Sequence, residues 1–142
     1  YQPDSGIVQI IYGSAGGLTS VGNQLWRQGT GGLPDTEETS DHFGRALAAG
    51  DYDRDGCADL AVGVPHEDLE EPEPAVLDAG VAHVLYGSGN GLTANGNQFW
   101  YQGSTGLVGP AEQTDYFGFA LAAVRVPLRL LYLPLILRSA SP

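Results

Sequence analysis

The chain has 142 residues, enough for one modest domain, and its 21 glycines and 9 prolines favour tight turns and short strands over long helices. Its formal net charge of −11 disfavours nucleic acid and anionic membranes as partners, because both would repel it. A single cysteine allows no internal disulfide, and no apolar run reaches the roughly 18–20 residues that span a bilayer, so we expect no membrane span.

An internal repeat with an offset of 74 residues organises the chain, and 23 of 44 positions are identical between residues 6–49 and residues 80–123. No long segment has the 3.6-residue period of an amphipathic helix. Short β-rich segments bounded by turn residues predict strands. In chain order we expect these strands at residues 6–12, 24–29, 43–49, 58–64, 80–86, 98–103 and 117–123. Four short strands per repeat are typical of a propeller blade, so the predicted fold class is all-β, a partial β-propeller.

Alternating acids after the third predicted strand indicate a cation site. Acids stand at the first, third, fifth and ninth positions of a short loop, and Gly56 at the sixth allows the sharp bend. A hard cation such as calcium takes six to eight oxygens at about 2.3–2.6 Å, and alternate carboxylates on a curled loop converge on one point. Four carboxylates without a cation would repel one another. We therefore predict a bound Ca²⁺ with the ligands Asp51, Asp53, Asp55, Cys57 (backbone carbonyl) and Asp59.

Other interpretations of this loop fit less well. An EF-hand needs an acid at position twelve, which here is Val62, whereas Asp59 is followed directly by a strand. A solvated acidic turn is the plain alternative. The pair Asp51 and Asp53 is also similar to the Asp-x-Asp of haloacid-type phosphatases, but that motif follows a buried apolar strand and here Gly50 precedes it.

Nothing else in the sequence indicates catalysis. His42, His66 and His83 are scattered and unpaired with a plausible nucleophile, so we expect ordinary histidines and no enzyme activity. Trp26 and Trp100 occupy equivalent repeat positions and are expected to pack between blades, with a sugar-binding surface as the alternative.

These residues resemble the FG-GAP repeat of integrin α-subunits and their bacterial relatives. Phe43-Gly44 matches the FG element, residues 51–59 match D-x-D-x-D-G-x-x-D, and Gly63-Val64-Pro65 stands where Gly-Ala-Pro is usual. The strand from Gly80 to Gly87 matches the following G-x-V-x-V-L-Y-G element. The resemblance implies a blade order in which the calcium loop joins the first and second strands and stiffens the blade.

The same resemblance divides the chain. Residues 1–29 are the last two strands of a preceding blade, residues 30–103 one complete four-stranded blade, and residues 104–123 the start of the next. Within the complete blade, the acidic, proline-containing segment 66–79 reads as a solvated insertion, with a weak cation site or a recognition loop as alternatives. One blade with parts of two others leaves sheet faces exposed, so we expect the isolated chain to be marginally stable.

The segment 124–142 departs from the repeat. A second metal loop is due after Ala123, but an apolar, arginine-containing stretch without acids follows instead. We hypothesise a break in the reading frame or gene structure near Val124. A genuine terminal tail, or an apolar segment that docks on a partner, is the alternative.

Two functions are consistent with the resemblance. The first is a calcium-stabilised adhesion or interaction module whose loops bind a protein or glycan and whose faces bind the remaining blades of the parent propeller. The second is an accessory or carbohydrate-binding propeller attached to a secreted enzyme such as a hydrolase. Weak calcium sites of about 10⁻⁴–10⁻³ M suit external calcium, so we expect an extracellular location, secreted or at the cell surface. The chain begins with Tyr1 and shows no signal peptide, which indicates a processed or excerpted N-terminus.

Overall fold

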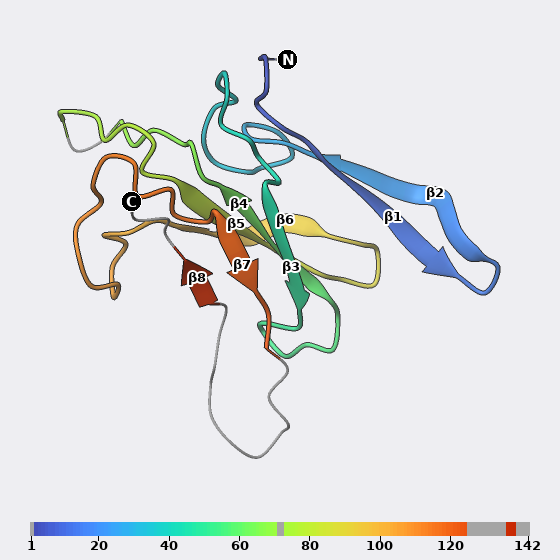
Figure 1. Cartoon of the computed structure of the whole chain (residues 1–142). Coiled ribbons are helices and arrows are strands. Elements are labelled where there is room, and N and C mark those ends of the chain that lie inside the picture. The colour runs from blue at the N-terminus through green and yellow to red at the C-terminus, as the bar shows by residue number, and fades with distance from the viewer. Residues whose placement is uncertain (1, 71–72, 125–135, 139–142) are drawn as a thin grey trace.

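The computed structural model describes residues 2–70, 73–124 and 136–138, and every regular element in these ranges is a β-strand (Figure 1). The strands pair antiparallel in three sheets, β1–β2, β3–β4–β5–β6 and β7–β8. The prediction of an all-β fold with a four-stranded blade between parts of two others is confirmed. No helix in the described ranges has the length and apolar character needed to cross a membrane. The strand bounds are β1 (Val8–Ser14), β2 (Gly17–Trp26), β3 (Ala46–Gly50), β4 (Asp59–Val64), β5 (Val81–Tyr86), β6 (Thr93–Trp100), β7 (Ala120–Ala122) and β8 (Ile136–Arg138).

Several strand ends differ from the sequence prediction. β3 begins at Ala46 and not at residue 43, because Phe43 and Gly44 form a turn in which Gly44 has a φ of 88°. β2 and β6 begin at Gly17 and Thr93, well before the predicted residues 24 and 98. In the β1–β2 and β5–β6 hairpins, a bulge shifts the strand register next to Tyr12 and Tyr86, respectively. The strands pair again beyond the bulge, closer to the turn, so β2 and β6 begin earlier than predicted.

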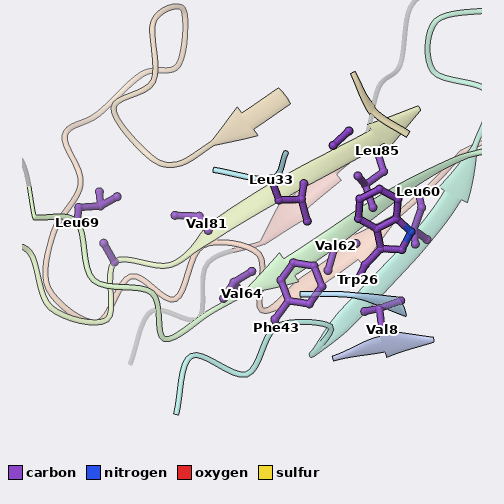
Figure 2. Packing of buried hydrophobic residues seen from close by; sticks show 12 residues of the cluster. Val8, Trp26, Leu33, Phe43, Leu60, Val62, Val64, Leu69, Val81 and Leu85 are labelled. Atoms are coloured by element: carbon purple, nitrogen blue, oxygen red, sulfur yellow. The ribbon is translucent and has the colours of Figure 1, made fainter. Parts of the chain in front are cut away.

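The main core lies between the first hairpin and the four-stranded sheet. β4 and β5 are buried along nearly their whole length, and one of their faces presents branched aliphatic side chains. Opposite that face lie four large apolar side chains from the preceding part of the chain (Figure 2). These are Val8, Trp26, Leu33 and Phe43. Burying such side chains contributes about 1.5–3 kcal/mol each, so this contact is a main source of the fold's stability.

The opposite face of the sheet is lined by small residues and contacts β7. Ala48, Ala61 and Val84 form this second cluster, and Leu121 of β7 packs against it. A Cβ on Gly63 would stand 2.0 Å from the carbonyl oxygen of Gly118, so only glycine allows the two backbones to approach this closely. The repeat therefore stacks face on face, as expected for neighbouring blades.

The segment after β4 is less solvated than predicted. Glu67 and Leu69 are buried, and Leu69 forms an isolated antiparallel bridge with Val76. Glu70 and Glu73 remain exposed. The interpretation of residues 66–79 as a wholly solvated insertion is wrong for Glu67 and Leu69, because Leu69 belongs to the core and Glu67 accepts a hydrogen bond from buried Gln28. Apart from Val124 and β8, the segment 124–142 lies outside the described residues, and the hypothesis of a break there stays a prediction.

Candidate metal centre

The predicted metal loop connects the two strands of the sheet that precede and follow it. β3 ends at Gly50 and β4 begins at Asp59, and these two residues are register partners. The intervening residues therefore leave the sheet and return to the same point. Two positive φ angles make the tight reversal possible, 67° at Arg54 and 91° at Gly56.

Three of the predicted acids converge. Asp51, Asp53 and Asp59 each offer a carboxylate oxygen, and these atoms lie within 4.8 Å of one another. Asp51 and Asp53 are exposed and Asp59 is buried. A divalent cation at the centre of such a set would bind three carboxylates at once, which would supply part of the six to eight oxygens that calcium takes.

Asp59 is the anchor of the loop. Its Oδ2 accepts a hydrogen bond of 2.5 Å from the backbone N–H of Tyr52, and its Oδ1 accepts one of 2.8 Å from the backbone N–H of Gly87. Gly87 lies 28 residues away in the turn after β5, so this carboxylate ties the loop to a neighbouring hairpin. Each carboxylate oxygen has two lone pairs, so both bonds leave acceptor capacity for a cation.

The other acids shape the loop from within. Asp51 Oδ2 accepts from the backbone N–H of Gly56 at 3.2 Å, and Asp53 Oδ1 accepts from that of Asp55 at 3.1 Å. Asp55 Oδ1 accepts from the backbone N–H of Cys57 at 2.7 Å, and Asp55 is not a member of the converging set. The roles of Asp55 and of the Cys57 carbonyl as ligands therefore stay predictions.

The loop concentrates negative charge, and neighbouring groups respond to it. Burial, and then the nearby Asp59 carboxylate, raise the pKa of the Tyr52 hydroxyl. Burial raises the pKa of Tyr86 as well, with Asp53 and Asp59 adding to the effect. The pKa of the Cys57 thiol is also raised, by desolvation and by Asp55. Burial is the largest cause of all three shifts, and the smaller effect of the carboxylates has the sign that would favour a cation.

The residue types and their placement fit calcium. The carboxylate oxygens of the converging acids are hard ligands, and Gly56 supplies the bend that alternate ligands require. Asp51, Asp53 and Asp59 would hold the ion, and neutralising their repulsion is what the ion would contribute. Tyr52 and Gly87, which fix Asp59 through their backbone N–H groups, carry no side-chain signal and could not have been found from the sequence.

The remaining candidate residues are dispersed. His83 is fully buried and packs between Phe43 and Phe99, with ring centroids 5.8 and 5.0 Å away. Burial lowers the pKa of His83 to about 4, so it is neutral at physiological pH. His66 lies 2.8 Å from Asp78 and 4.8 Å, between ring centroids, from His42. None of the described histidines lies in the converging acid set.

A buried polar contact between blades was missed by the sequence analysis. Glu67 accepts a hydrogen bond from Gln28 Nε2, and both side chains are buried. Burial, followed by the carboxyl group of Asp35, raises the pKa of Glu67 well above its usual range. A carboxyl group with a raised pKa holds its proton to a higher pH than an exposed glutamate does. The acidic run signalled solvent exposure, whereas the tertiary fold buries its first member.

Comparison with known proteins agrees with the sequence motifs. Residues 43–85 match the FG-GAP repeat family, a range that contains the predicted metal loop, β3, β4 and all of β5 except Tyr86. Phosphatidylinositol-glycan-specific phospholipase D of Rattus norvegicus is 36% identical over 99 residues, which are 70% of this chain and 9% of that protein. The chain therefore spans about a tenth of the length of this relative. The predicted resemblance to an FG-GAP repeat is confirmed.

Proposed function

Because this chain carries an FG-GAP repeat over residues 43–85, we propose that it is a calcium-binding propeller segment that serves as a non-catalytic, extracellular interaction module. The observation that carries the proposal is the convergence of Asp51, Asp53 and Asp59 within 4.8 Å. Calcium would bind the folded loop and not the unfolded chain, so it would add to stability by mass action.

The position of the loop supports a structural role for the ion. Asp59 begins β4 and accepts hydrogen bonds from Tyr52 in the loop and from Gly87 after β5. An ion held by this carboxylate would fix the ends of β3, β4 and β5 relative to one another. Recognition of a protein or glycan would then be left to loops that the stiffened blade positions.

One observation favours a second candidate function. The similar protein from Rattus norvegicus is named as a phospholipase D specific for phosphatidylinositol-glycan. The chain corresponds to a small part of that protein, so the same kind of segment would be an accessory propeller attached to a secreted hydrolase. In that case this segment would contribute stability or ligand recognition and no catalytic residue.

A calcium titration by calorimetry tests the metal site. We expect the chain to bind about one Ca²⁺ with an affinity of about 10⁻⁴–10⁻³ M. Asp53→Ala should abolish the binding, whereas Glu70→Ala, which removes an exposed acid outside the loop, should leave it unchanged. A folded chain that binds no calcium, or an Asp53→Ala variant that binds as the native chain does, would contradict the proposal.

A further inference from the structure

Tyr52 stands between two of the converging acids and carries the part-buried side chain of the loop. Residues 51–56 all belong to the described part of the chain, and among them Tyr52 is part-buried while the other five are exposed. The Tyr52 ring packs against the cluster of Ala48, Ala61 and Val84 on the central sheet. The loop is therefore attached to the sheet through this side chain as well as through its two ends.

The ring of Tyr52 lies over the end of β3. The Tyr52 hydroxyl donates to the backbone carbonyl of Ala48 at 3.0 Å. A Cβ placed on Gly50 would stand 2.7 Å from Cε1 of the Tyr52 ring and 3.2 Å from its Cζ. A real Cβ atom does not approach another atom as closely as 2.7 Å, so the ring occupies the space that a side chain at position 50 would fill.

Gly50 makes room for the Tyr52 ring and is not required by the backbone. The φ of Gly50 lies outside the left-handed region, in contrast to that of Gly56 at 91°. Alanine can therefore adopt the backbone conformation of Gly50 without strain. The three atoms nearest to the added Cβ all belong to the Tyr52 ring. A substitution at residue 50 would consequently displace this ring first.

The backbone of Tyr52 reaches the third converging acid. The Tyr52 N–H donates to Asp59 Oδ2 at 2.5 Å, while the Gly87 N–H donates to Oδ1 of the same carboxylate at 2.8 Å. Two donors on different oxygens fix the orientation of this carboxylate. Tyr52 is also joined through the chain to Asp51 and Asp53. Holding this one residue in place therefore restrains all three acids of the converging set.

We propose that Tyr52 is a positioning residue of the calcium site, whose ring, seated over Gly50 and tied to Ala48, holds the three carboxylates in their binding arrangement before the ion arrives. This inference rests on the proposed function, because it assigns a determinant of affinity to the same loop. A site that is ordered in advance loses less conformational freedom on binding and therefore binds more tightly. Groups that orient metal ligands typically contribute about 10–100-fold to metal affinity.

A residue that only packs and a residue that positions ligands differ in what they change. A packing residue stabilises the folded chain and leaves the affinity of the folded loop for calcium unchanged. A positioning residue changes that affinity and also the order of the calcium-free loop. Tyr101 provides the comparison, because it is also part-buried, packs against the main core and lies outside the loop.

Calcium titration by calorimetry on folded variants of the 142-residue chain tests the effect on affinity. Tyr52→Ala should weaken calcium binding by about 10-fold, at the lower end of the range for groups that orient metal ligands. Tyr52→Phe keeps the ring and loses only the hydrogen bond to Ala48, so it should weaken binding less. Tyr101→Ala should lower the free energy of unfolding and leave the calcium affinity of the folded chain unchanged.

A double-mutant cycle tests the seating of the ring over Gly50. Gly50→Ala should weaken calcium binding, because its Cβ displaces the Tyr52 ring. In a Tyr52→Ala background the space is empty, so the same substitution should have no further effect. Equal effects of Gly50→Ala in both backgrounds would overturn the inference. Gly50→Ala also keeps the whole Tyr52 side chain, so it carries the test if Tyr52→Ala does not fold.

Amide hydrogen exchange in a calcium chelator measures the order of the loop without the ion. The Tyr52 N–H is protected by its hydrogen bond to Asp59. In Gly50→Ala this amide should exchange faster than in the native chain, because the displaced ring no longer holds it. The control Gly89→Ala, whose Cβ would have nothing within 4 Å, should leave the exchange rate unchanged. An unchanged rate in Gly50→Ala would speak against a positioning role.

The calcium titration separates this inference from the proposed function. A native chain that binds no calcium contradicts the proposed function and, with it, this inference. A native chain that binds calcium, beside a folded Tyr52→Ala variant that binds it equally well, contradicts the inference alone. Weaker binding in Tyr52→Ala and in Gly50→Ala, with unchanged binding in Tyr101→Ala, supports both.

Discussion

Replacing two acids of the metal loop separates ion binding from the structural role of the loop. Asp53 is exposed, and its hydrogen bond to the Asp55 N–H can be replaced by water. Asp59 is buried and accepts from the backbone N–H groups of Tyr52 and Gly87. Asp53→Ala should therefore remove calcium binding alone, whereas Asp59→Ala should remove calcium binding and also destabilise the calcium-free protein.

The two effects have different sizes. Leaving a buried N–H without a partner costs roughly 1–3 kcal/mol. The Gly87 N–H is buried and the Tyr52 N–H part-buried, so losing both bonds in Asp59→Ala should cost about 2–5 kcal/mol without calcium. Asp53→Ala should change the calcium-free free energy of unfolding by about 0.5 kcal/mol or less, as exposed substitutions do. At a calcium concentration about 100 times the dissociation constant, the ion adds about 2.7 kcal/mol to the native chain and nothing to either variant.

Urea unfolding monitored by circular dichroism measures both effects. The native chain and both variants would be compared at one protein concentration, in about 10 mM calcium and in a calcium chelator, which corresponds to about 100 times a dissociation constant of 10⁻⁴ M. A calcium-dependent shift that survives in Asp53→Ala would refute the assignment of the site. Equal calcium-free stabilities for the two variants would refute the anchoring role of Asp59.

Three further substitutions test other parts of the structure. Burial raises the pKa of Glu67 in the folded protein above its value in the unfolded chain. The contribution of Glu67 to stability is therefore present at low pH and falls as the pH rises from about 4.5 toward the raised pKa. Glu67→Gln should flatten this part of the pH–stability profile, measured by thermal unfolding. His83→Leu removes two buried ring nitrogens that have no hydrogen-bond partner. The free energy of unfolding, measured with urea, should stay equal or rise by about 1 kcal/mol. A loss above about 2 kcal/mol would contradict this and show that the ring nitrogens have a hydrogen-bond partner. Gly80 has a φ of 75°, and Gly80→Ala would place a Cβ 2.4 Å from the backbone nitrogen of Phe117. This variant should lower the free energy of unfolding by at least about 2 kcal/mol. The control Gly89→Ala, whose Cβ would have nothing within 4 Å, should change it little.

The sequence determined the architecture of this protein because its pattern is local and repeated. Glycine-bounded β-rich segments and an ungapped 74-residue offset were enough to predict short strands, four to a blade, and the order of their repeat. The convergence of Asp51, Asp53 and Asp59 was predictable for the same reason, since their spacing brings the carboxylates to one side of a curled loop, whereas the bound calcium stays a prediction. Strand ends were predicted less well, because a bulge and the turn at Gly44 depend on pairing between strands.

Only the tertiary structure decided which of these residues are buried and what they contact. Glu67 belongs to an acidic run, yet packing against the preceding blade buries it beside Gln28, and this burial raises its pKa. Asp59 resembles the other acids of its loop in sequence, but it acts as the anchor because Gly87, 28 residues later, donates to it. Burial and long-range hydrogen bonds arise where segments distant in the chain meet, so no local pattern encodes them.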